Sequence, residues 1–266
     1  MIYLSKVKLN NTAYVANLSG GKDSLAKTYR LIEEGYPLTH VVFYDTGMEF
    51  RATYNNIDRI RPMVEAYGAQ LVILRPESNW LVDMLIKPVK ERDTGNVHYG
   101  YEWCGGCTRW RTSGKIGTIN KFLLSLGNYV QYIGIAADEP DRIKDEANKC
   151  YPLVEWEMTE KKCLDYCYEK GFHWQEDGVE LYSILKRVSC WCCGNKNLEE
   201  LRNMYHYLPY YWELLKGLQS RIDRPFYGKY TVFELEERFR LEDAQMSLFD
   251  FGICDGNCGT CGGNCK

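Results

Sequence analysis

The sequence has no long hydrophobic run. No apolar segment approaches the roughly 18 residues of a membrane-spanning helix. The first stretch, MIYLSKVKLNNTAYV, is interrupted by Lys6, Lys8 and two asparagines, so it lacks the apolar core of a signal peptide. We therefore expect no membrane segment and a cytoplasmic protein.

An excess of one charge is also missing. The 266 residues carry 33 Lys and Arg against 36 Asp and Glu, a net charge of −3. A global basic field, which would predict a nucleic-acid partner, is therefore absent. A local basic cluster of Arg109, Arg111 and Lys115 is the one feature that favours an RNA acceptor.

Histidine is scarce, with four residues at positions 40, 98, 173 and 206. None are spaced as HxH or HxxxH, so we expect packed or surface histidines rather than metal ligands. Cysteine, by contrast, is abundant, with twelve residues. In a reducing compartment, so many thiols favour metal binding or redox chemistry over structural disulfides.

Short apolar runs alternate with helix-like segments in the first half of the chain. The runs cover residues 14–18, 40–45, 69–74 and 129–137, and the helical segments cover about 23–34, 51–67 and 113–126. This alternation predicts an α/β fold with a parallel sheet flanked by helices.

The pattern changes after about residue 152, where segments 159–170, 196–206 and 231–243 have helical patterns. We predict three parts: a nucleotide-binding α/β domain (1–150), a helical C-terminal region that completes a cysteine site (151–245), and a flexible tail rich in Cys and Gly (246–266). The tail is too poor in apolar residues to form a core of its own.

The stretch Ser19-Gly-Gly-Lys-Asp-Ser24 follows an apolar run and opens a helical segment. Glycines let the backbone approach an anion, and the free N–H groups of a helix start point toward it. The spacing matches neither the Walker A loop nor GxGxxG. A phosphate-binding loop is therefore predicted; the alternative is a Gly-Gly turn with Asp23 or Ser24 as the helix cap.

This loop resembles the PP-loop, SGGxDS, of ATP pyrophosphatases and sulfonucleotide reductases. Three further stretches, YDTGMEF (44–50), WCGGCTRWRTSGKIGTINKFL (103–123) and IGIAADEPDR (133–142), resemble segments of the phosphoadenosine phosphosulfate (PAPS) reductase family, in the family's order. The resemblance implies an adenine nucleotide α-hydrolase-like fold over roughly residues 14–200.

The resemblance also implies a nucleotide site for PAPS, adenylyl sulfate or ATP. Its predicted residues are Ser19, Gly20, Gly21, Lys22, Asp23, Ser24, Asp45, Thr46, Gly47 and Arg142. Asp45 is expected to accept hydrogen bonds from an adenosine, and Arg142 to pair with a phosphate or sulfate. The alternatives are a turn at the end of a strand for Asp45 and Thr46, and a solvated surface charge for Arg142.

Two C-x₂-C pairs, Cys104/Cys107 and Cys190/Cys193, stand about eighty residues apart. Two such turns supply four thiolates to one centre. The resemblance to iron–sulfur sulfonucleotide reductases implies a [4Fe–4S] cluster, although CGGC stands where those enzymes have adjacent cysteines. Zinc is the alternative, and Cys192 offers a fifth thiol.

The tail carries Cys254, Cys258, Cys261 and Cys265. The reductases end in Glu-Cys-Gly-Leu-His, whose thiolate attacks the sulfate sulfur, and that segment is missing here. The tail is expected to bind a second metal, to pass sulfur or electrons to the nucleotide site, or to have no role in the chemistry. Lys22, Asp23 and Cys258 are the predicted catalytic residues.

Three functions follow from these features. The first is sulfonucleotide reduction, in which a tail thiolate attacks the substrate and a thioredoxin-like reductant releases sulfite. The second is an ATP-dependent sulfurtransferase, which adenylates an RNA or small acceptor with Mg²⁺ and then inserts sulfur from a donor. The third is a nucleotide- and cluster-binding module of a larger complex without turnover of its own.

Overall fold

The computed structural model describes residues 3–91, 93–105 and 110–250. Cys107 and the tail cysteines lie outside these residues, as does Arg109. The chain divides into two compact units, Met1–Glu200 and Leu201–Lys266. The predicted boundary at residue 150 remains a prediction. No helix among the described residues is long and apolar enough to cross a membrane.

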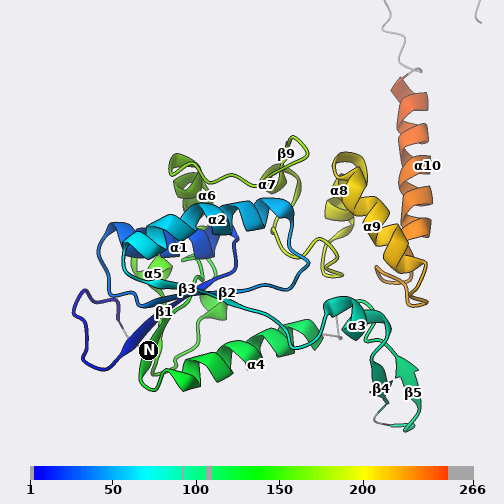
Figure 1. The fold of residues 1–266 in the computed structure, drawn as a ribbon. Coiled ribbons are helices and arrows are strands. Elements are labelled where there is room, and N and C mark those ends of the chain that lie inside the picture. The colour runs from blue at the N-terminus through cyan, green and yellow to red at the C-terminus, as the bar shows by residue number, and fades with distance from the viewer. Residues whose placement is uncertain (1–2, 92, 106–109, 251–266) are drawn as a thin grey trace, which may run out of the picture. The chain divides into compact units, whose positions relative to one another are not determined.

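A five-stranded parallel sheet forms the centre of the first unit, in the order β3-β2-β1-β6-β7 (Figure 1). Its strands are β1 (Ala13–Leu18), β2 (His40–Tyr44), β3 (Gln70–Leu74), β6 (Tyr129–Tyr132) and β7 (Lys149–Cys150). The predicted α/β fold with a parallel sheet is confirmed.

Helices connect and cover the strands. They are α1 (Lys22–Glu33), α2 (Arg51–Ala66), α3 (Trp80–Leu85), α4 (Trp110–Ser125), α5 (Pro152–Glu155), α6 (Glu160–Glu169) and α7 (Leu181–Ile184), with a 3₁₀ turn, η1 (Pro140–Arg142). Two short antiparallel hairpins pair β4 (Pro88–Lys90) with β5 (Val97–Tyr99), and β8 (Gln175–Glu176) with β9 (Val179–Glu180).

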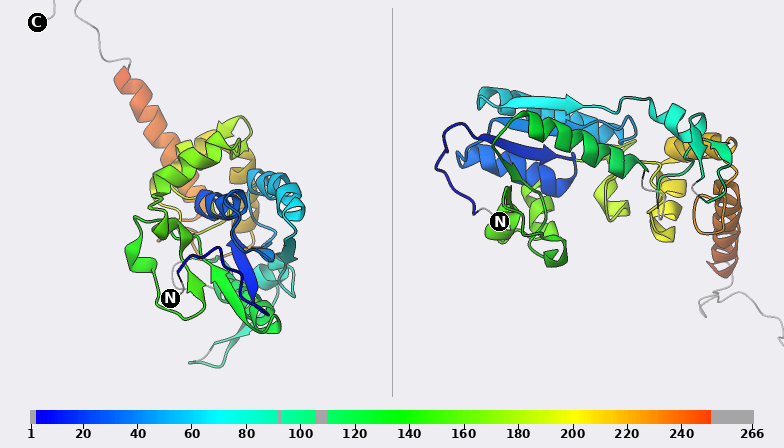
Figure 2. Two further views of the ribbon diagram at one scale, coloured as in Figure 1. Left: turned by 90° about the vertical axis from the view of Figure 1, so that its left-hand side faces the viewer. Right: turned by 90° about the horizontal axis from the view of Figure 1, so that it is seen from below.

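The two faces of the sheet are covered by different helices. On one face, Ile119 and Leu123 of α4 pack against Val15, Val42 and Tyr44, and the view from below shows α4 lying across the strands (Figure 2). Helices α1 and α2 cover the opposite face (Figure 1). Side chains of β1 therefore alternate between two apolar layers, as expected for a central parallel strand.

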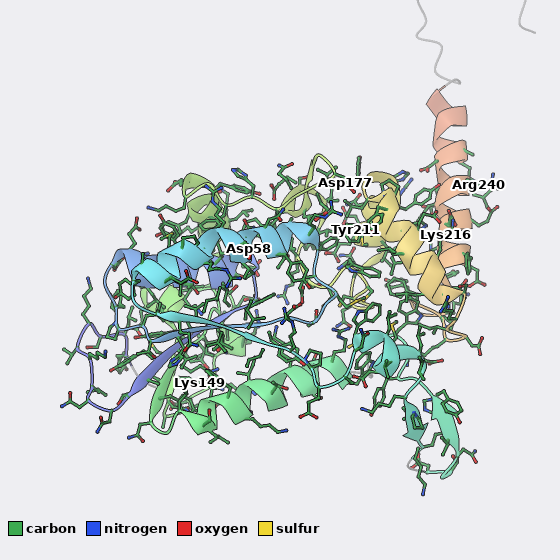
Figure 3. The ribbon with its side chains drawn as sticks, viewed as in Figure 1. Asp58, Lys149, Asp177, Tyr211, Lys216 and Arg240 are labelled. Atoms are coloured by element: carbon green, nitrogen blue, oxygen red, sulfur yellow. The ribbon has the colours of Figure 1, made fainter. Side chains whose placement is uncertain are left out.

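The second unit is helical, as the sequence pattern predicts for its segments. It contains α9 (Pro209–Gln219), α10 (Val232–Asp250) and most of α8 (Leu198–Tyr207). Tyr205, Trp212 and Phe239 pack together, with ring centroids 5.6–5.9 Å apart. Lys216 of α9, labelled in Figure 3, has its ammonium group 3.1 Å from the Glu236 carboxylate of α10.

Strand β6 is shorter than its apolar run. The run covers residues 129–137, but the β1–β6 ladder ends where Ala16 pairs with Tyr132. The two strands part beyond this point, and Lys27 of α1 lies beneath the fork. Its ammonium group donates to the carbonyls of Asn17 at 2.6 Å and Tyr132 at 3.0 Å.

Lys27 is fully buried, and burial lowers its pKa to about 7. In the unfolded chain this pKa is near 10.5. Between these two values the unfolded chain binds the extra proton, so the free energy of unfolding rises with pH. The contribution of Lys27 to the free energy of unfolding is therefore largest above pH 10.5. It decreases as the pH falls and is fully lost below about pH 7.

We predict that Lys27→Met removes this pH dependence. The difference in unfolding free energy between wild type and variant should change by about 2 kcal/mol in favour of the wild type between pH 7 and 9, because the slope is about 1.36 kcal/mol per pH unit well above the folded-state pKa and half of that at pH 7. Denaturant unfolding at both pH values measures it. Lys161→Met, which removes an exposed lysine, should give no such change. If the free energies of unfolding of wild type and Lys27→Met change equally between pH 7 and 9, the prediction is wrong.

Candidate functional site

The predicted phosphate loop lies between the end of β1 and the start of α1. Ser24 Oγ accepts from the Ser19 backbone N–H at 3.0 Å and donates to the Gly21 carbonyl at 3.0 Å. Ser19 Oγ lies 2.9 Å from the same hydroxyl. These bonds hold the loop at the positive end of α1, where an anion is stabilised.

Gly20 has a positive φ of 80° and lies close to α2. A Cβ at this position would lie 2.4 Å from Thr53 Cγ2, and Thr53 is buried. A side chain here therefore meets both backbone strain and a steric clash. This is the physical reason for glycine at the second position of the loop.

Three residues from the later segment 160–185 hold the loop from outside. Trp174 Nε1 donates to the Gly20 carbonyl at 2.8 Å, and the Tyr182 hydroxyl accepts from the Lys22 N–H at 2.9 Å. The thiol of Cys167, in α6, contacts the Lys22 carbonyl at 3.3 Å. The loop is therefore fixed by contacts that are distant in sequence.

Lys22 and Asp23, two of the predicted catalytic residues, pair with each other. Lys22 Nζ lies 3.0 Å from Asp23 Oδ1 and 3.5 Å from Glu160 Oε2. Burial raises the pKa of the Asp23 carboxyl, and the Lys22 ammonium opposes that rise. The lysine thus meets two carboxylates at the start of α1.

Asp45 lies at the end of β2 with both carboxylate oxygens bonded. Oδ1 accepts from the Gly47 N–H at 2.9 Å and the Tyr54 hydroxyl at 2.8 Å, and Oδ2 pairs with Arg75 at 3.1 Å. The bond from the Gly47 N–H closes a turn at the end of the strand, which was the alternative to a nucleotide-binding role. Adenosine recognition by Asp45 stays a prediction.

A cavity of about 310 Å³ joins the phosphate loop to the cysteine segments. Its wall includes Ser19 of the loop, Thr46 of the DTG segment and four thiols, those of Cys104, Cys190, Cys192 and Cys193. Three of the four predicted cluster ligands therefore share one cavity with the loop. Asp45 and Arg142 lie outside its lining.

The two cysteine segments touch through their backbones. The Gly194 N–H donates to the Cys104 carbonyl at 3.2 Å. A Cβ on Gly105 would lie 2.9 Å from Gly194 Cα, so only glycine permits this approach. Among the described residues, no three His, Cys, Asp or Glu side chains form a group that could hold a metal ion.

The second cysteine segment also docks on the DTG segment. The Trp191 N–H donates to the Met48 carbonyl at 3.0 Å. The Cys190 thiol lies 3.6 Å from Glu49 Oε1, which also accepts from the Thr46 hydroxyl at 2.8 Å. Glu49 was not foreseen, because one acidic residue next to a turn gives no spacing signal.

Burial dominates the protonation of these thiols. It raises the pKa of Cys104 and Cys190 above the ordinary thiol value, and that of Cys192 to about 12. The backbone N–H groups of Arg111 and Thr112, at the start of α4, oppose the rise at Cys104. Without a metal, these thiols therefore stay protonated at neutral pH.

Arg111 is a cation of this cavity that was foreseen only as part of a basic cluster. Its guanidinium stacks between Trp80 and Trp110, 5.8 and 5.3 Å from their centroids, and donates to the Thr46 carbonyl. Its Nη1 is buried without a hydrogen-bond partner, and no carboxylate of the described residues pairs with it. Arg111 and Lys115 line this cavity together with one carboxylate, that of Glu49, so two cations face one anion there.

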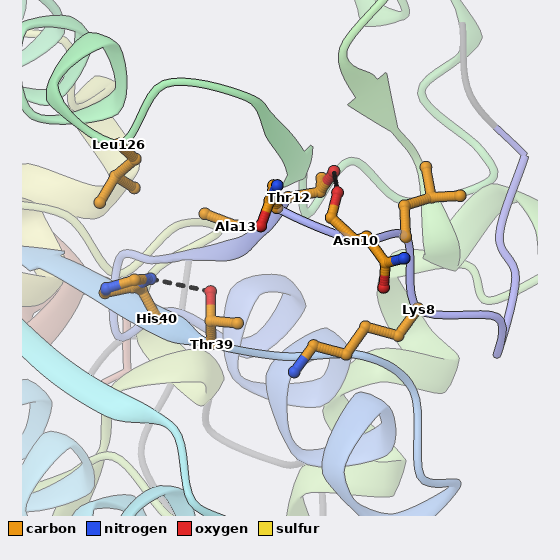
Figure 4. Close-up of a pocket in the computed structure, with 9 residues that line it drawn as sticks. Lys8, Asn10, Thr12, Ala13, Thr39, His40 and Leu126 are labelled. Atoms are coloured by element: carbon orange, nitrogen blue, oxygen red, sulfur yellow. Dashed lines mark hydrogen bonds between the residues drawn. The ribbon is translucent and has the colours of Figure 1, made fainter.

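A second hollow lies at the opposite, amino-terminal edge of the sheet (Figure 4). It is shallow, and Thr39, His40 and Leu126 are among its lining residues. His40 Nδ1 lies 2.8 Å from the Thr39 hydroxyl, and its ring packs on Phe122. The PP-loop and the DTG segment follow the carboxyl ends of β1 and β2, at the other edge, where open α/β sheets bind ligands.

The comparison with protein families decides the family. The model of the phosphoadenosine phosphosulfate reductase domain matches residues 13–176. The chain belongs to this family. The match begins with β1 and ends with β8, so it contains the PP-loop, the DTG segment and the first cysteine pair. The resemblance drawn from the sequence motifs is confirmed.

Individual relatives are more distant. The chain is 25% identical over 230 residues to the uncharacterized protein MJ0066 of Methanocaldococcus jannaschii, which covers 77% of this chain. The chain spans only 41% of the length of that relative.

Two solved structures also match. The U34-tRNA thiolase NcsA from Methanococcus maripaludis, with its [4Fe–4S] cluster, matches at 15% identity and a TM-score of 0.41, over 88% of this chain and 72% of that one. Candida glabrata FMN adenylyltransferase, in complex with FAD and inorganic pyrophosphate, matches at 18% identity and a TM-score of 0.30, over 59% and 48%.

Gly20→Ala tests the PP-loop of this family member. We predict a loss of stability greater than the about 1–2 kcal/mol that a left-handed backbone costs a non-glycine residue, together with at least tenfold weaker ATP binding. Denaturant unfolding and calorimetric titration measure the two effects.

Gly35→Ala is the matched control, because Gly35 has a φ of 74° but nothing within 4 Å of its Cβ position. This variant should lose only the backbone contribution and leave ATP binding intact. Adding Thr53→Ser to Gly20→Ala removes the clashing methyl group and should restore part of both losses. Equal losses in the two single variants would show that the contact with Thr53 has no role.

Proposed function

We propose that the chain is an ATP-dependent sulfurtransferase, which adenylates an oxygen of its acceptor and replaces that oxygen with sulfur. The observation that carries the proposal is the shared cavity, in which the PP-loop residue Ser19 and four thiols line one space of about 310 Å³. Adenylation takes place on the acceptor oxygen and sulfur attacks the carbon bonded to it, so the phosphate and the sulfur source must meet at that one group.

The residues divide into two roles. The backbone of the PP-loop and the start of α1 would hold the phosphates of ATP, with Mg²⁺ bound alongside them. Arg111 and Lys115 would stabilise the negative charge that develops on the reacting α-phosphate. The unpaired Nη1 of Arg111 supports this role, since a buried guanidinium normally has an anionic partner.

The reaction balances without an external oxidant. The acceptor oxygen attacks the α-phosphorus of ATP, a new O–P bond forms, the bond to the β-phosphate breaks, and pyrophosphate leaves. Sulfur at the oxidation level of sulfide then attacks the activated carbon, the C–S bond forms, the C–O bond breaks, and AMP leaves with the electron pair.

The donor set is suited to a soft metal. Thiolates select iron–sulfur clusters or zinc, and Cys104, Cys190 and Cys193 share one cavity wall. With Cys107 as fourth ligand, they would hold the predicted [4Fe–4S] cluster, which requires their side chains to lie closer together than in the described structure, where no three of them form a metal-binding group. A cluster there would supply iron sites with affinity for sulfur.

Sulfonucleotide reduction is the second candidate, and the family match over residues 13–176 favours it. In that reaction a thiolate, predicted as Cys258, attacks the sulfur of the bound sulfonucleotide. An S–S bond forms as the S–O bond to the nucleotide breaks. A thioredoxin-like dithiol then releases sulfite and is itself oxidised to a disulfide.

Product analysis separates the two candidates. We predict pyrophosphate release from ATP in anaerobic reactions with sulfide and bulk transfer RNA as the probe acceptor, and no sulfite from adenylyl sulfate or PAPS with thioredoxin. Arg111→Gln should lower the rate at least tenfold, whereas Arg61→Gln, which removes a partly exposed arginine paired with Asp58, should not. Sulfite release would select reduction instead. Nucleotide binding with neither product would select the non-catalytic module.

Anaerobic purification tests the metal. We predict a brown protein that contains iron and acid-labile sulfide, and a colourless Cys190→Ser variant. Cys163→Ala, which removes a buried thiol of α6 outside the cavity, should keep its colour. Stoichiometric zinc in a colourless wild type would replace the cluster with the zinc alternative, because Zn²⁺ is d¹⁰ and has no visible chromophore.

A further inference from the structure

Two arginines from distant segments converge on one carboxylate beside the PP-loop. Arg142, in η1, pairs with Glu139 through Oε2. Arg187, which follows α7, pairs with the other oxygen, Oε1, at 2.8 Å. Glu139 therefore bridges two guanidinium groups, one on each carboxylate oxygen.

The geometry of this bridge is set by the local backbone. The Arg142 N–H donates to the Glu139 carbonyl at 3.1 Å, which closes the 3₁₀ turn and places both side chains on the same side. The Glu139 side chain is 11% exposed, whereas those of Arg142 and Arg187 are 50% and 65% exposed. The arginines can therefore reach an incoming anion.

The bridge lies at the rim of the PP-loop. The carbonyl of Val188, next to Arg187, is 3.8 Å from the position that a Cβ on Gly21 would take. On the other side, Asp138 Oδ1 accepts from the Glu160 N–H at 2.9 Å, and Glu160 pairs with Lys22. The residue after Arg187 therefore lies next to the loop backbone at Gly21, and the residue before Glu139 bonds Glu160, the partner of the Lys22 ammonium.

We propose that Arg142 and Arg187 form an anion subsite for a second charged group of the nucleotide, and that Glu139 occupies this subsite until the nucleotide arrives. The inference rests on the proposed nucleotide site at the PP-loop. The group is a phosphate beyond the one on the loop, either the β- and γ-phosphates of a triphosphate or a 3′-phosphate on the ribose.

The energetics permit the exchange. Partly exposed ion pairs stabilise a protein little, because water and salt screen them. A phosphate carries more charge than a carboxylate and accepts from two guanidinium groups in a fixed geometry. A nucleotide with a second phosphate can therefore displace Glu139, whereas a nucleotide with one phosphate leaves the bridge intact.

Removal of the carboxylate charge tests the subsite through a gain of affinity, which misfolding cannot produce. Glu139→Gln should bind ATP, adenosine 3′,5′-bisphosphate, or both, about three- to tenfold more tightly than wild type, with AMP unchanged. Calorimetric titration of the full chain with all three nucleotides measures this. Glu146→Gln, which removes a carboxylate paired with Lys149, should leave all three affinities unchanged.

Removal of Arg187 should have the opposite effect, a loss of nucleotide affinity. Arg187→Gln should weaken binding of the favoured nucleotide about tenfold, and the double variant Glu139→Gln/Arg187→Gln should lose most of the gain. A gain for ATP alone assigns the subsite to the triphosphate chain, and a gain for the bisphosphate alone assigns it to the 3′-phosphate.

Two results would overturn the inference. If Glu139→Gln changes no affinity, or raises that for AMP equally, no second phosphate reaches the arginines, and the proposed nucleotide site still stands. If wild type binds none of the three nucleotides, the proposed function and the subsite fail together.

Discussion

The site depends on the fork between β1 and β6, which Lys27 holds from below. Strand order reverses at this point, because β2 and β3 lie on one side of β1 and β6 and β7 on the other. Open α/β sheets bind ligands at such a reversal. By donating to the Asn17 and Tyr132 carbonyls, Lys27 fixes the two strand ends from which the PP-loop and segment 133–142 begin.

A buried lysine is costly unless it is neutral or well bonded. Here the two carbonyls supply bonds, and burial shifts the pKa to about 7. An apolar residue in its place would leave the carbonyls without this donor. Lys27 therefore lowers the stability at neutral pH, but its two hydrogen bonds fix the separation of the two strand ends.

The sequence predicts the individual strands and loops of the site better than it predicts which of them come into contact. Alternating apolar runs locate the strands, because a buried parallel strand needs apolar side chains on both faces. The SGGKDS loop follows from local backbone chemistry, so its place between β1 and α1 is also predictable. The shared cavity could not be predicted, because it arises where Gly105 packs against Gly194, 89 positions further along the chain.

The residues missed by sequence reasoning share that long-range origin. Arg187 follows a helix of four residues and gains a role only through Glu139. Trp174 and Tyr182 look like ordinary aromatics until they bond the loop backbone. Lys27 gives a faint signal, since it falls on the helix face with Leu31, but the same pattern fits a lysine that extends to solvent.

The two sides of the site differ in how their positive charges are paired. On the α6 side, each cation near the PP-loop already has a carboxylate, as Lys22 has Asp23 and Glu160, and Arg142 and Arg187 have Glu139. On the thiol side, Arg111 has no carboxylate among the described residues. An anion therefore enters the thiol side without displacing a partner, but must displace a carboxylate on the α6 side. In the proposed site, a nucleotide with several phosphates would satisfy both sides at once, with one phosphate on the loop and the others extending to either side. Such a nucleotide would keep its reacting phosphorus beside the cysteines, where sulfur chemistry requires it.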